Sequence, residues 1–452
     1  MLARVGDWLR DHQRIIRRLQ WLVVAVYAVL LVVPAALPLP ASSAPLWSHV
    51  TLIAQFVFWG MWWPFVLLSV VALGRTWCGL FCPEGFLSEV ASRHGQGRAT
   101  PRWITWGGWP FVAFCTTTAY GQLVSVYQYP APALLVLGGS TVLAVAVGYR
   151  YGREKRVWCR YLCPVSGVFG LLAKLAPLHY RVDEDAWRAA TRAGGHFRRV
   201  NCAPLVPIAT MKGASQCHMC GRCAGFRDAV ALSPRPPNQE IVEVAGRVAR
   251  PWESALILFG LHGLALGAFV WPASGRLVLV KQAVAGWLLR HEIVWPLERS
   301  APWWLLTNYP ARNDVLNLLD GALVLAAMLA VAALLGGILS LLIALAVRGL
   351  GAWSWPRFHH LAQALIPLAG GGIFLGLSAL TVSTLRAEGF DPNWMDGART
   401  LLLAGAWLWS QGLALAILRR QGGSRVGRAA SGAAMTGAST LAAAAWHHAL
   451  LA

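Results

Sequence analysis

Residues 156–164 of this chain read Arg-Val-Trp-Cys-Arg-Tyr-Leu-Cys-Pro, and residues 75–83 read Arg-Thr-Trp-Cys-Gly-Leu-Phe-Cys-Pro. The two stretches share the pattern Arg-x-Trp-Cys-x-x-x-Cys-Pro, and each follows a pair of long apolar runs. Two copies that each follow two membrane crossings lie on the same side of the bilayer and form a parallel repeat. The repeated pattern therefore predicts two cysteine pairs at one membrane face.

The composition around the repeat is that of a membrane protein. Of 452 residues, 57% are apolar and only 13% are charged, which excludes an ordinary soluble globule. Apolar runs near twenty residues can cross a hydrocarbon core of about 30 Å. We therefore expect an all-α polytopic membrane protein with eight or nine spans. The expected spans are Trp21–Leu39, Val50–Leu73, Trp103–Tyr127, Ala133–Gly148, Trp252–Trp271, Val315–Val347, Leu361–Leu385, Leu401–Leu418 and, less apolar, Ala429–Leu451.

The net charge of +20 is explained by the enrichment of cytoplasmic loops in Arg and Lys, so no nucleic-acid partner is expected. The basic residues 1–20 place the N-terminus in the cytoplasm, and no cleavable signal follows them. We expect a bacterial inner-membrane protein with its cysteine motifs on the cytoplasmic side. Its expected parts are a basic N-terminus at 1–20, four spans with the first motif at 21–149, a cysteine-rich cytoplasmic segment at 150–250 and a C-terminal membrane region at 252–452.

The repeated cysteines are candidate ligands of an iron–sulfur cluster. Thiolate is the natural ligand of such clusters, and Cys-Pro commonly ends a ferredoxin ligand run. Arg75, Arg156 and Arg160 would favour thiolate and offset the cluster's negative charge. One pair supplies two ligands and a cubane takes four, so the hypothesis is one site made by both copies: Cys78, Cys82, Cys159 and Cys163. The alternative is that these are buried small apolar residues; disulfides are disfavoured in a reducing compartment.

A second cysteine group lies at residues 217–223, which read Cys-His-Met-Cys-Gly-Arg-Cys. This spacing is the front of a bacterial ferredoxin run. No cysteine follows Cys223, so Cys202 is the candidate fourth ligand beside Cys217, Cys220 and Cys223. Zinc is the competing metal because four thiolates also suit a tetrahedral site. His218 is expected to be exposed rather than coordinating.

The ninth cysteine and the histidines of the C-terminal region complete the candidate residues. Cys115 is expected to be a packing residue inside a span. Ionisable residues inside a membrane are functional candidates, so haem b held by two histidines is a further cofactor hypothesis. Its candidates are His262, His359, His360, His447 and His448. The alternative is that these are interfacial histidines, since four of the five lie near the ends of spans.

Over residues 50–240 the chain resembles the bacterial membrane polyferredoxins. This family includes the quinol-oxidising subunit of periplasmic nitrate reductase systems, the regulator-like electron donor of nitrous oxide reductase, the accessory protein of cbb3-type cytochrome oxidase and polyferredoxins of ferrous-iron uptake. The resemblance rests on the paired Cys-x-x-x-Cys-Pro motifs and the ferredoxin-like run after them. The chain departs from the family in having one incomplete ferredoxin run and an added membrane region at 252–452.

The resemblance implies a redox relay, a component of an oxidoreductase rather than a stand-alone enzyme. One or two 4Fe–4S clusters would pass single electrons from a cytoplasmic ferredoxin or flavodoxin, or from quinone, to a membrane or periplasmic acceptor. Besides these redox proteins, membrane lipid is the expected partner. Two alternatives remain open: a reductase or assembly factor for iron or copper, and a structural zinc-thiolate scaffold.

Overall fold

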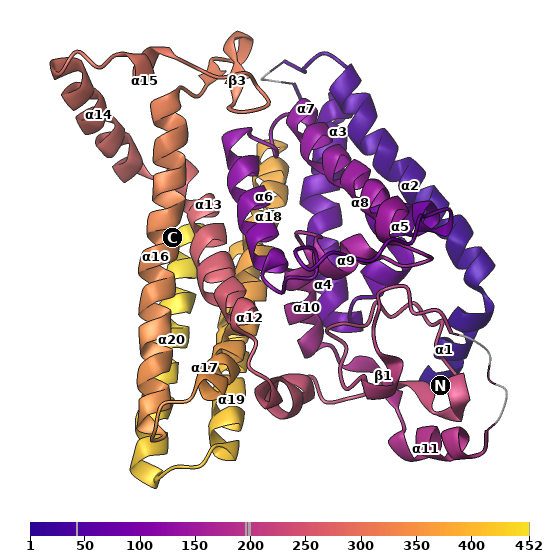
Figure 1. Ribbon diagram of the computed structural model, residues 1–452. Helices are drawn as coiled ribbons and strands as arrows, with labels where there is room; N and C mark the ends of the chain where they lie inside the picture. The colour runs from indigo at the N-terminus through magenta and orange to yellow at the C-terminus, as the bar shows by residue number, and fades with distance from the viewer. Residues whose placement is uncertain (42–43, 195–196, 198–199, 452) are drawn as a thin grey trace. The chain divides into compact units, whose positions relative to one another are not determined.

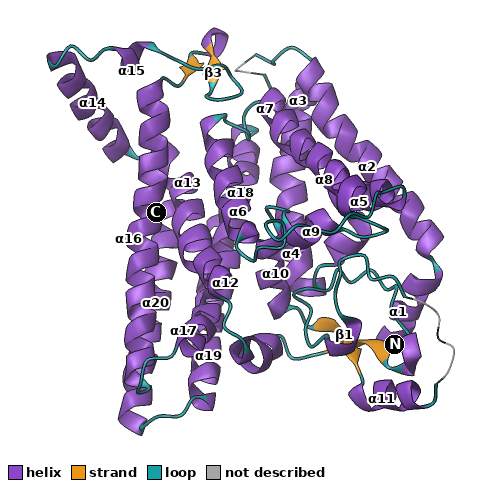
Figure 2. Ribbon diagram, in the orientation of Figure 1, coloured by secondary structure: helices purple, strands orange, loops and turns teal. Residues whose placement is uncertain are grey.

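The computed structural model describes residues 1–41, 44–194, 197 and 200–451. Residues 195–196 and 198–199 of the expected cysteine-rich segment, and residue 452 at the end of the expected C-terminal region, lie outside the described residues. The described chain is helical with two short antiparallel strand pairs, drawn in orange in Figure 2. The predicted all-α membrane fold class is confirmed.

The described residues contain seven helical segments that are long and apolar enough to cross a membrane. They are Gln13–Ala36, Val50–Leu73, Pro130–Tyr151, Pro251–Ala273, Leu318–Gly349, Trp355–Ala387 and Trp394–Arg420. The predicted number of eight or nine spans is not confirmed. The expected third span contains only the 15-residue helix α6 (Trp109–Leu123), which at 1.5 Å per residue is shorter than a bilayer core. The expected ninth span is a helix, α20 (Arg425–Leu450), that is not among these seven.

The chain divides into two compact units whose segments alternate along the sequence. Unit 1 comprises residues 1–29, 65–113 and 139–253, and unit 2 comprises residues 30–64, 114–138 and 254–452. Every cysteine of the three sequence motifs belongs to unit 1, as does Cys202.

Unit 1 combines ends of membrane helices with a small mixed α/β region. Its helical elements are α1 (Leu2–Asp11), the start of α2 (Gln13–Ala36), most of α4 (Trp63–Leu73), η3 (Trp77–Phe81), α5 (Pro83–Arg93), α8 (Gly139–Tyr151), α9 (Val157–Tyr161), α10 (Ser166–Leu172), η5 (Ala173–Leu175), α11 (Glu184–Arg192), η6 (Ile208–Thr210), η7 (Phe226–Asp228), η8 (Glu240–Val244) and η9 (Ala245–Arg247). Its strands are β1 (Leu178–Val182) and β2 (Val230–Pro234).

The β1–β2 pair brings the two ends of one chain segment together. Leu178 lies opposite Pro234 and Val182 opposite Val230, in antiparallel register. The segment between the strands, residues 183–229, carries Cys202 and the 217–223 run. Helix α1 packs on the pair, so closely that a Cβ on Gly6 would lie 3.2 Å from the Cβ of Leu232; in Figure 1 the helix lies beside β1 near the label N.

Unit 2 is a helical bundle. Its elements are η1 (Leu46–Ser48), α3 (Val50–Gln55), η2 (Phe56–Trp62), most of α6, α7 (Pro130–Ala133), η4 (Leu134–Gly138), the end of α12 (Pro251–Ala255), η10 (Leu256–Ala265), α13 (Leu266–Val270), η11 (Trp271–Ala273), α14 (Gly275–Arg290), α15 (Trp295–Glu298), β3 (Asn308–Tyr309), η12 (Pro310–Arg312), β4 (Asp314–Val315), α16 (Leu318–Gly349), α17 (Trp355–Ala362), η13 (Gln363–Leu365), α18 (Ile366–Ala387), α19 (Trp394–Arg420) and α20.

Small residues set the distances between the unit 2 helices. A Cβ on Gly263 would lie 2.6 Å from the Cα of Ala332, and Ser431 Oγ on α20 donates to the Ala346 carbonyl on α16 at 2.6 Å. Figure 1 shows α16 and α20 side by side over much of their length. Close backbone approach at small residues is how membrane helices pack in the absence of a hydrophobic driving force.

Candidate metal centre

The first cysteine motif forms a wide helical turn followed by a new helix. Cys78 lies in η3, a π-helical segment, and the backbone N–H of Cys82 donates to the Trp77 carbonyl at 2.9 Å. Pro83 is the first residue of α5, and Cys82 Sγ accepts a hydrogen bond from the Gly85 N–H at 3.4 Å. Proline suits the first position of a helix because its missing N–H would have no partner there. Cys82 is thus held at a helix N-terminus.

The second motif repeats the same local hydrogen bond. Cys159 lies in α9, and the Cys163 N–H donates to the Trp158 carbonyl at 3.0 Å. Pro164 again follows the second cysteine, although here a turn precedes the next helix, α10. In both copies the bond spans five residues and is accepted by the backbone carbonyl of the residue before the first cysteine.

The two copies face one another. A Cβ on Gly85, three residues after Cys82, would lie 3.3 Å from Cys159 Sγ. Burial raises the pKa of Cys82 and of Cys163 well above the usual thiol value, and in both cases thiolates of the other motif add to the effect. Burial also raises the pKa of Cys159 to about 12. The four thiols that the repeat predicted as one site, Cys78, Cys82, Cys159 and Cys163, therefore lie together.

The remaining cysteines of unit 1 form a second set around one small cavity. Cys202, Cys217, Cys220 and Cys223 all line it. Cys202 is brought there by the residues before the second motif: the Arg156 N–H donates to the Ala203 carbonyl at 2.8 Å, and Lys155 Nζ donates to the Cys202 carbonyl at 3.2 Å. Burial raises the pKa of Cys217 to about 12, and the pKa of Cys202 and of Cys223 is raised in the same way.

The spacing of these thiols is not that of a single-ion site. Among the described residues, no three or more His, Cys, Asp or Glu side chains come close enough together to hold one metal ion. A tetrahedral zinc site needs four sulfurs within about 2.3 Å of one ion. A cubane places each thiolate on a different iron, so its four sulfurs stand farther apart.

Buried polar atoms around the two sets test that fit. Arg75 Nε, Arg156 Nη2, Tyr180 Oη and His218 Nδ1 are buried without a hydrogen-bond partner in the described part of the chain. Tyr180 and His218 line the cavity of the second set. Buried donors normally have acceptors, and the sulfurs of a 4Fe–4S cluster accept hydrogen bonds that tune its potential. The residues present fit clusters bound to both sets of thiolates.

His218 differs from expectation, because the side chain is 2% exposed rather than on the surface. The run 217–220 is covered by the first motif: a Cβ on Gly79 would clash with the His218 carbonyl and lie 3.0 Å from the Cys220 nitrogen. Burial lowers the pKa of His218, and the nearby guanidinium of Arg75 lowers it further, so the ring is neutral. The sequence contains no local signal of this cover, since it comes from Gly79, which lies far earlier in the chain.

Two buried carboxylates also escaped the sequence reasoning. Glu89, on α5, pairs with Arg156 and Arg222 at 2.7 Å each. Glu240, on η8, pairs with Arg235 and accepts the Ala214 N–H at 2.7 Å, just before Cys217. Acidic residues are few in this apolar and basic chain. That scarcity is the only sequence signal that could have indicated Glu89 or Glu240.

The other candidate residues lie in unit 2. Cys115 packs against the apolar residues Leu264, Ala268, Val324, Met328 and Ala332. Trp446 Nε1 donates to His262 Nδ1 at 3.1 Å, so Nε2 carries the proton and faces the Leu365 carbonyl at 3.3 Å. Neither nitrogen of His262 is then available to an iron. His359 bonds Ser254 and His360 bonds Gln421, while His447 and His448 are exposed.

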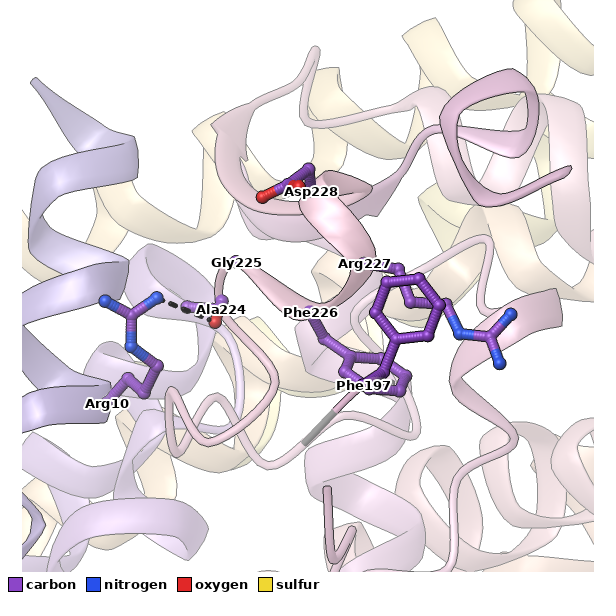
Figure 3. A pocket seen from close by; sticks show the side chains of 7 residues that line it. All are labelled: Arg10, Phe197, Ala224, Gly225, Phe226, Arg227 and Asp228. Carbon is purple, nitrogen blue, oxygen red and sulfur yellow. Dashed lines mark hydrogen bonds between the residues drawn. The ribbon is translucent and has the colours of Figure 1, made fainter. Parts of the chain in front are cut away.

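A pocket of about 360 Å³ opens beside the second set, immediately after Cys223. Figure 3 shows its lining: Arg10, Phe197, Ala224, Gly225, Phe226, Arg227 and Asp228. Arg10 Nη1 donates to the Ala224 carbonyl at 3.1 Å, and the Arg227 guanidinium lies 4.8 Å from the Trp187 ring and 5.0 Å from the Phe197 ring. The pocket thus joins cationic and aromatic groups close to a candidate cluster.

Comparison with known proteins shows what parts of the chain resemble. The pattern of a family described as "4Fe-4S binding domain" matches residues 55–101 and 133–182, two stretches that contain the two Cys-x-x-x-Cys-Pro motifs. These two stretches of the chain are similar to that 4Fe–4S binding domain. The second cysteine set lies outside the matched stretches.

Two curated relatives are similar to parts of the chain. The "Putative electron transport protein YccM" of Escherichia coli is 22% identical over 239 residues, which is 46% of this chain and 65% of the relative. The "Methylamine utilization ferredoxin-type protein MauN" of Methylorubrum extorquens is 27% identical over 164 residues, 33% of this chain and 54% of the relative. The matches thus span less than two thirds of either relative. No solved structure matches the chain.

Proposed function

We propose that this protein is an electron relay of the bacterial inner membrane that holds two 4Fe–4S clusters on its cytoplasmic side. One cluster would be held by Cys78, Cys82, Cys159 and Cys163, and the other by Cys202, Cys217, Cys220 and Cys223. The observation that carries the proposal is the direct backbone contact between the two sets, at Gly79 and His218. Redox centres held by chain segments that are in backbone contact are suited to exchange electrons.

The residues of the two sites supply what such a relay needs. When bound, a 4Fe–4S cluster takes up and releases single electrons. Burial raises the pKa of Cys159 and of Cys217 to about 12, so only bound metal would hold these two as thiolates at neutral pH. Arg75 and Arg156, 5% and 1% exposed, add the positive charge that anionic clusters require in a medium of low dielectric constant. Four of the eight cysteines are buried and the other four are partly buried, which limits the access of water.

The distribution of basic residues supports the cytoplasmic orientation. Arg4, Arg10 and Arg14 precede or begin the first apolar helix, and Arg150 and Arg153 precede the second motif. Cytoplasmic flanks of membrane helices are enriched in such residues. The same charge favours an acidic cytoplasmic donor, such as a ferredoxin or flavodoxin, and the pocket at Arg10 and Arg227 lies beside the second set where such a donor would approach. Quinone is the alternative donor, and the acceptor would be a membrane or periplasmic redox protein.

The test is anaerobic purification in detergent, with iron and sulfide counted and low-temperature EPR spectra taken after reduction with dithionite. We expect about eight iron per chain, the content of two cubanes. Cys78→Ala and Cys217→Ala are each expected to remove one signal and leave the other. Cys115→Ala is the matched control, because Cys115 lies among apolar side chains of unit 2, and it is expected to change neither iron nor signals. Zinc in place of iron, or iron lost only through Cys217→Ala, would refute the two-cluster relay.

A further inference from the structure

Arg156 lies where the two cysteine sets meet. It precedes α9, three residues before Cys159, and its side chain is 1% exposed. One guanidinium nitrogen, Nη1, donates to the Cys78 carbonyl in the first set. Its backbone N–H donates to the Ala203 carbonyl, next to Cys202 of the second set. A single residue therefore bonds to the chain at both sets.

A carboxylate fixes the direction of this guanidinium. Glu89 Oε2 accepts from Arg156 Nε at 2.7 Å, and Glu89 Oε1 accepts from Arg222 Nη2 at 2.7 Å. Arg222 stands between Cys220 and Cys223, so the carboxylate joins a residue of each motif. With the Glu89 side chain 5% exposed, water does not compete for these bonds. The Arg156 guanidinium is thus held in one orientation rather than free to move.

The charge of Arg156 reaches thiolates of both sets. The guanidinium interacts electrostatically with Cys159 and with Cys220, and a Cβ on Gly85 would lie 3.4 Å from Arg156 Nη1 and 3.3 Å from Cys159 Sγ. Cys159 belongs to the first set and Cys220 to the second. The third nitrogen of the guanidinium, Nη2, is buried and has no hydrogen-bond partner among the described residues. It is a donor without an acceptor at the junction of two sites that fit sulfur-rich clusters.

We propose that Arg156, oriented by Glu89, is shared by the two clusters and sets the reduction potentials of both. This inference rests on the proposed two-cluster relay. Each cluster becomes more negative by one unit when it is reduced, and a fixed buried cation stabilises the more negative form. Because one cation serves both sites, its removal lowers both potentials in the same variant. A residue that tuned one cluster would move one potential alone.

The experiment is an EPR-monitored redox titration of the whole purified protein and of three variants. Arg156→Gln removes the charge, and Arg156→Lys keeps the charge but loses the planar guanidinium. Arg93→Gln is the matched control: Arg93 lies 3.9 Å from the same Glu89 carboxylate, but its side chain is 29% exposed. We expect Arg156→Gln to weaken reduction of each cluster tenfold or more, which is 59 mV for a one-electron couple. Arg156→Lys should recover at least half of each shift, and Arg93→Gln should leave both potentials within about 15 mV, a quarter of that value.

Each outcome decides the matter. A shift of one potential only, no shift, or an equal shift in Arg93→Gln would overturn the role of Arg156 while leaving the relay intact. If Arg156→Gln loses iron, the reduction potentials cannot be compared, and the measurement becomes which site has lost its cluster. Loss from both sites, with eight iron restored in Arg156→Lys, supports a residue shared by the two clusters. Loss from one site overturns it. Wild-type protein without two clusters would instead refute the relay itself.

Discussion

Gly79 and His218 meet through their main chains, at the point where the first cysteine motif touches the ferredoxin-like run. A Cβ at position 79 would lie 3.0 Å from the Cys220 nitrogen and closer still to the His218 carbonyl. Both partners in this contact are backbone, which cannot rotate aside as a flexible side chain can. Glycine is therefore required at position 79 for reasons of space.

Gly79→Ala is accordingly expected to separate the two motifs. Overpacking of a dense interior typically raises the free energy of the fold by about 1–3 kcal/mol, and a clash with backbone lies at the upper end or beyond. We expect less iron and less of both EPR signals in purified protein. Gly139→Ala is the control, since a Cβ there meets nothing within 4 Å. Normal iron content in Gly79→Ala would show that the two motifs do not depend on this contact.

The buried pair of Arg235 and Glu240 is expected to support the second set alone. Glu240 accepts the N–H groups of Ala214 and Ser215, and Arg235 donates to the carbonyls of Ala173 and Ala176. Removing one partner of a buried ion pair costs about 3–5 kcal/mol. Glu240→Ala should lower the denaturation temperature. It should also weaken the EPR signal that Cys217→Ala removes and leave unchanged the EPR signal that Cys78→Ala removes.

Glu184→Ala provides the comparison for that variant. Glu184 pairs with Lys212 at 3.5 Å, but both side chains are about half exposed, and such surface pairs contribute about 0–1 kcal/mol. It should behave as wild type. Equal effects of the two substitutions would contradict a structural role specific to Glu240.

The hydrogen bond between Trp446 and His262 is expected to contribute to protein stability and not to the visible absorption spectrum. The Trp446 indole donates to the fully buried His262 ring at 3.1 Å, and Trp446→Phe leaves that nitrogen without a donor. An unsatisfied buried acceptor costs about 1–3 kcal/mol, which should appear as a lower denaturation temperature in detergent. The visible spectrum should keep its shape. A b-type haem spectrum that disappears in His262→Ala would contradict this arrangement.

Iron-free protein is expected to become less stable as the pH rises. Burial raises the pKa of Cys159 and of Cys217 to about 12, against about 8.5 for an unfolded thiol. A thiol whose pKa is higher in the folded state than in the unfolded state stabilises the folded protein as long as it stays protonated. Its contribution to the free energy of unfolding is complete below about pH 8.5 and is lost as the pH rises toward 12. Denaturation temperatures of chelator-treated protein at pH 7 and pH 10 measure it. Cys159→Ala and Cys217→Ala should each flatten the dependence, and a pH-independent transition would argue against buried thiols.

The sequence predicted what depends on local pattern. The apolar runs predicted the membrane fold class, and the Arg-x-Trp-Cys-x-x-x-Cys-Pro repeat predicted a site whose cysteines the structure brings together. Cys202, chosen because no other cysteine of the segment was unassigned, lies on the cavity of the second set. Such features can be predicted because the sequence pattern and the structure that it forms lie within a few residues of each other. The cysteines can be assigned because the chain has so few of them.

Features that depend on distant segments were missed or misjudged. His218 is polar and was expected outside, yet Gly79 covers it. Glu89 pairs with Arg156, 67 positions along the chain, and nothing near Glu89 indicates a buried partner. The expected third span is not among the described helices that are long and apolar enough to cross a membrane, because Gly107 and Gly108 precede a helix that starts only at Trp109.

The antiparallel pair of β1 and β2 has a consequence for how such chains diversify. Because Val182 and Val230 are paired neighbours, the chain leaves and re-enters the rest of unit 1 at nearly one point. Each doubling of the length of such an excursion adds only about 0.6 kcal/mol of closure entropy. A longer ferredoxin insert could be exchanged for residues 183–229 through the same two strands. A change in the length of this segment would therefore leave the pairing of the two strands in place.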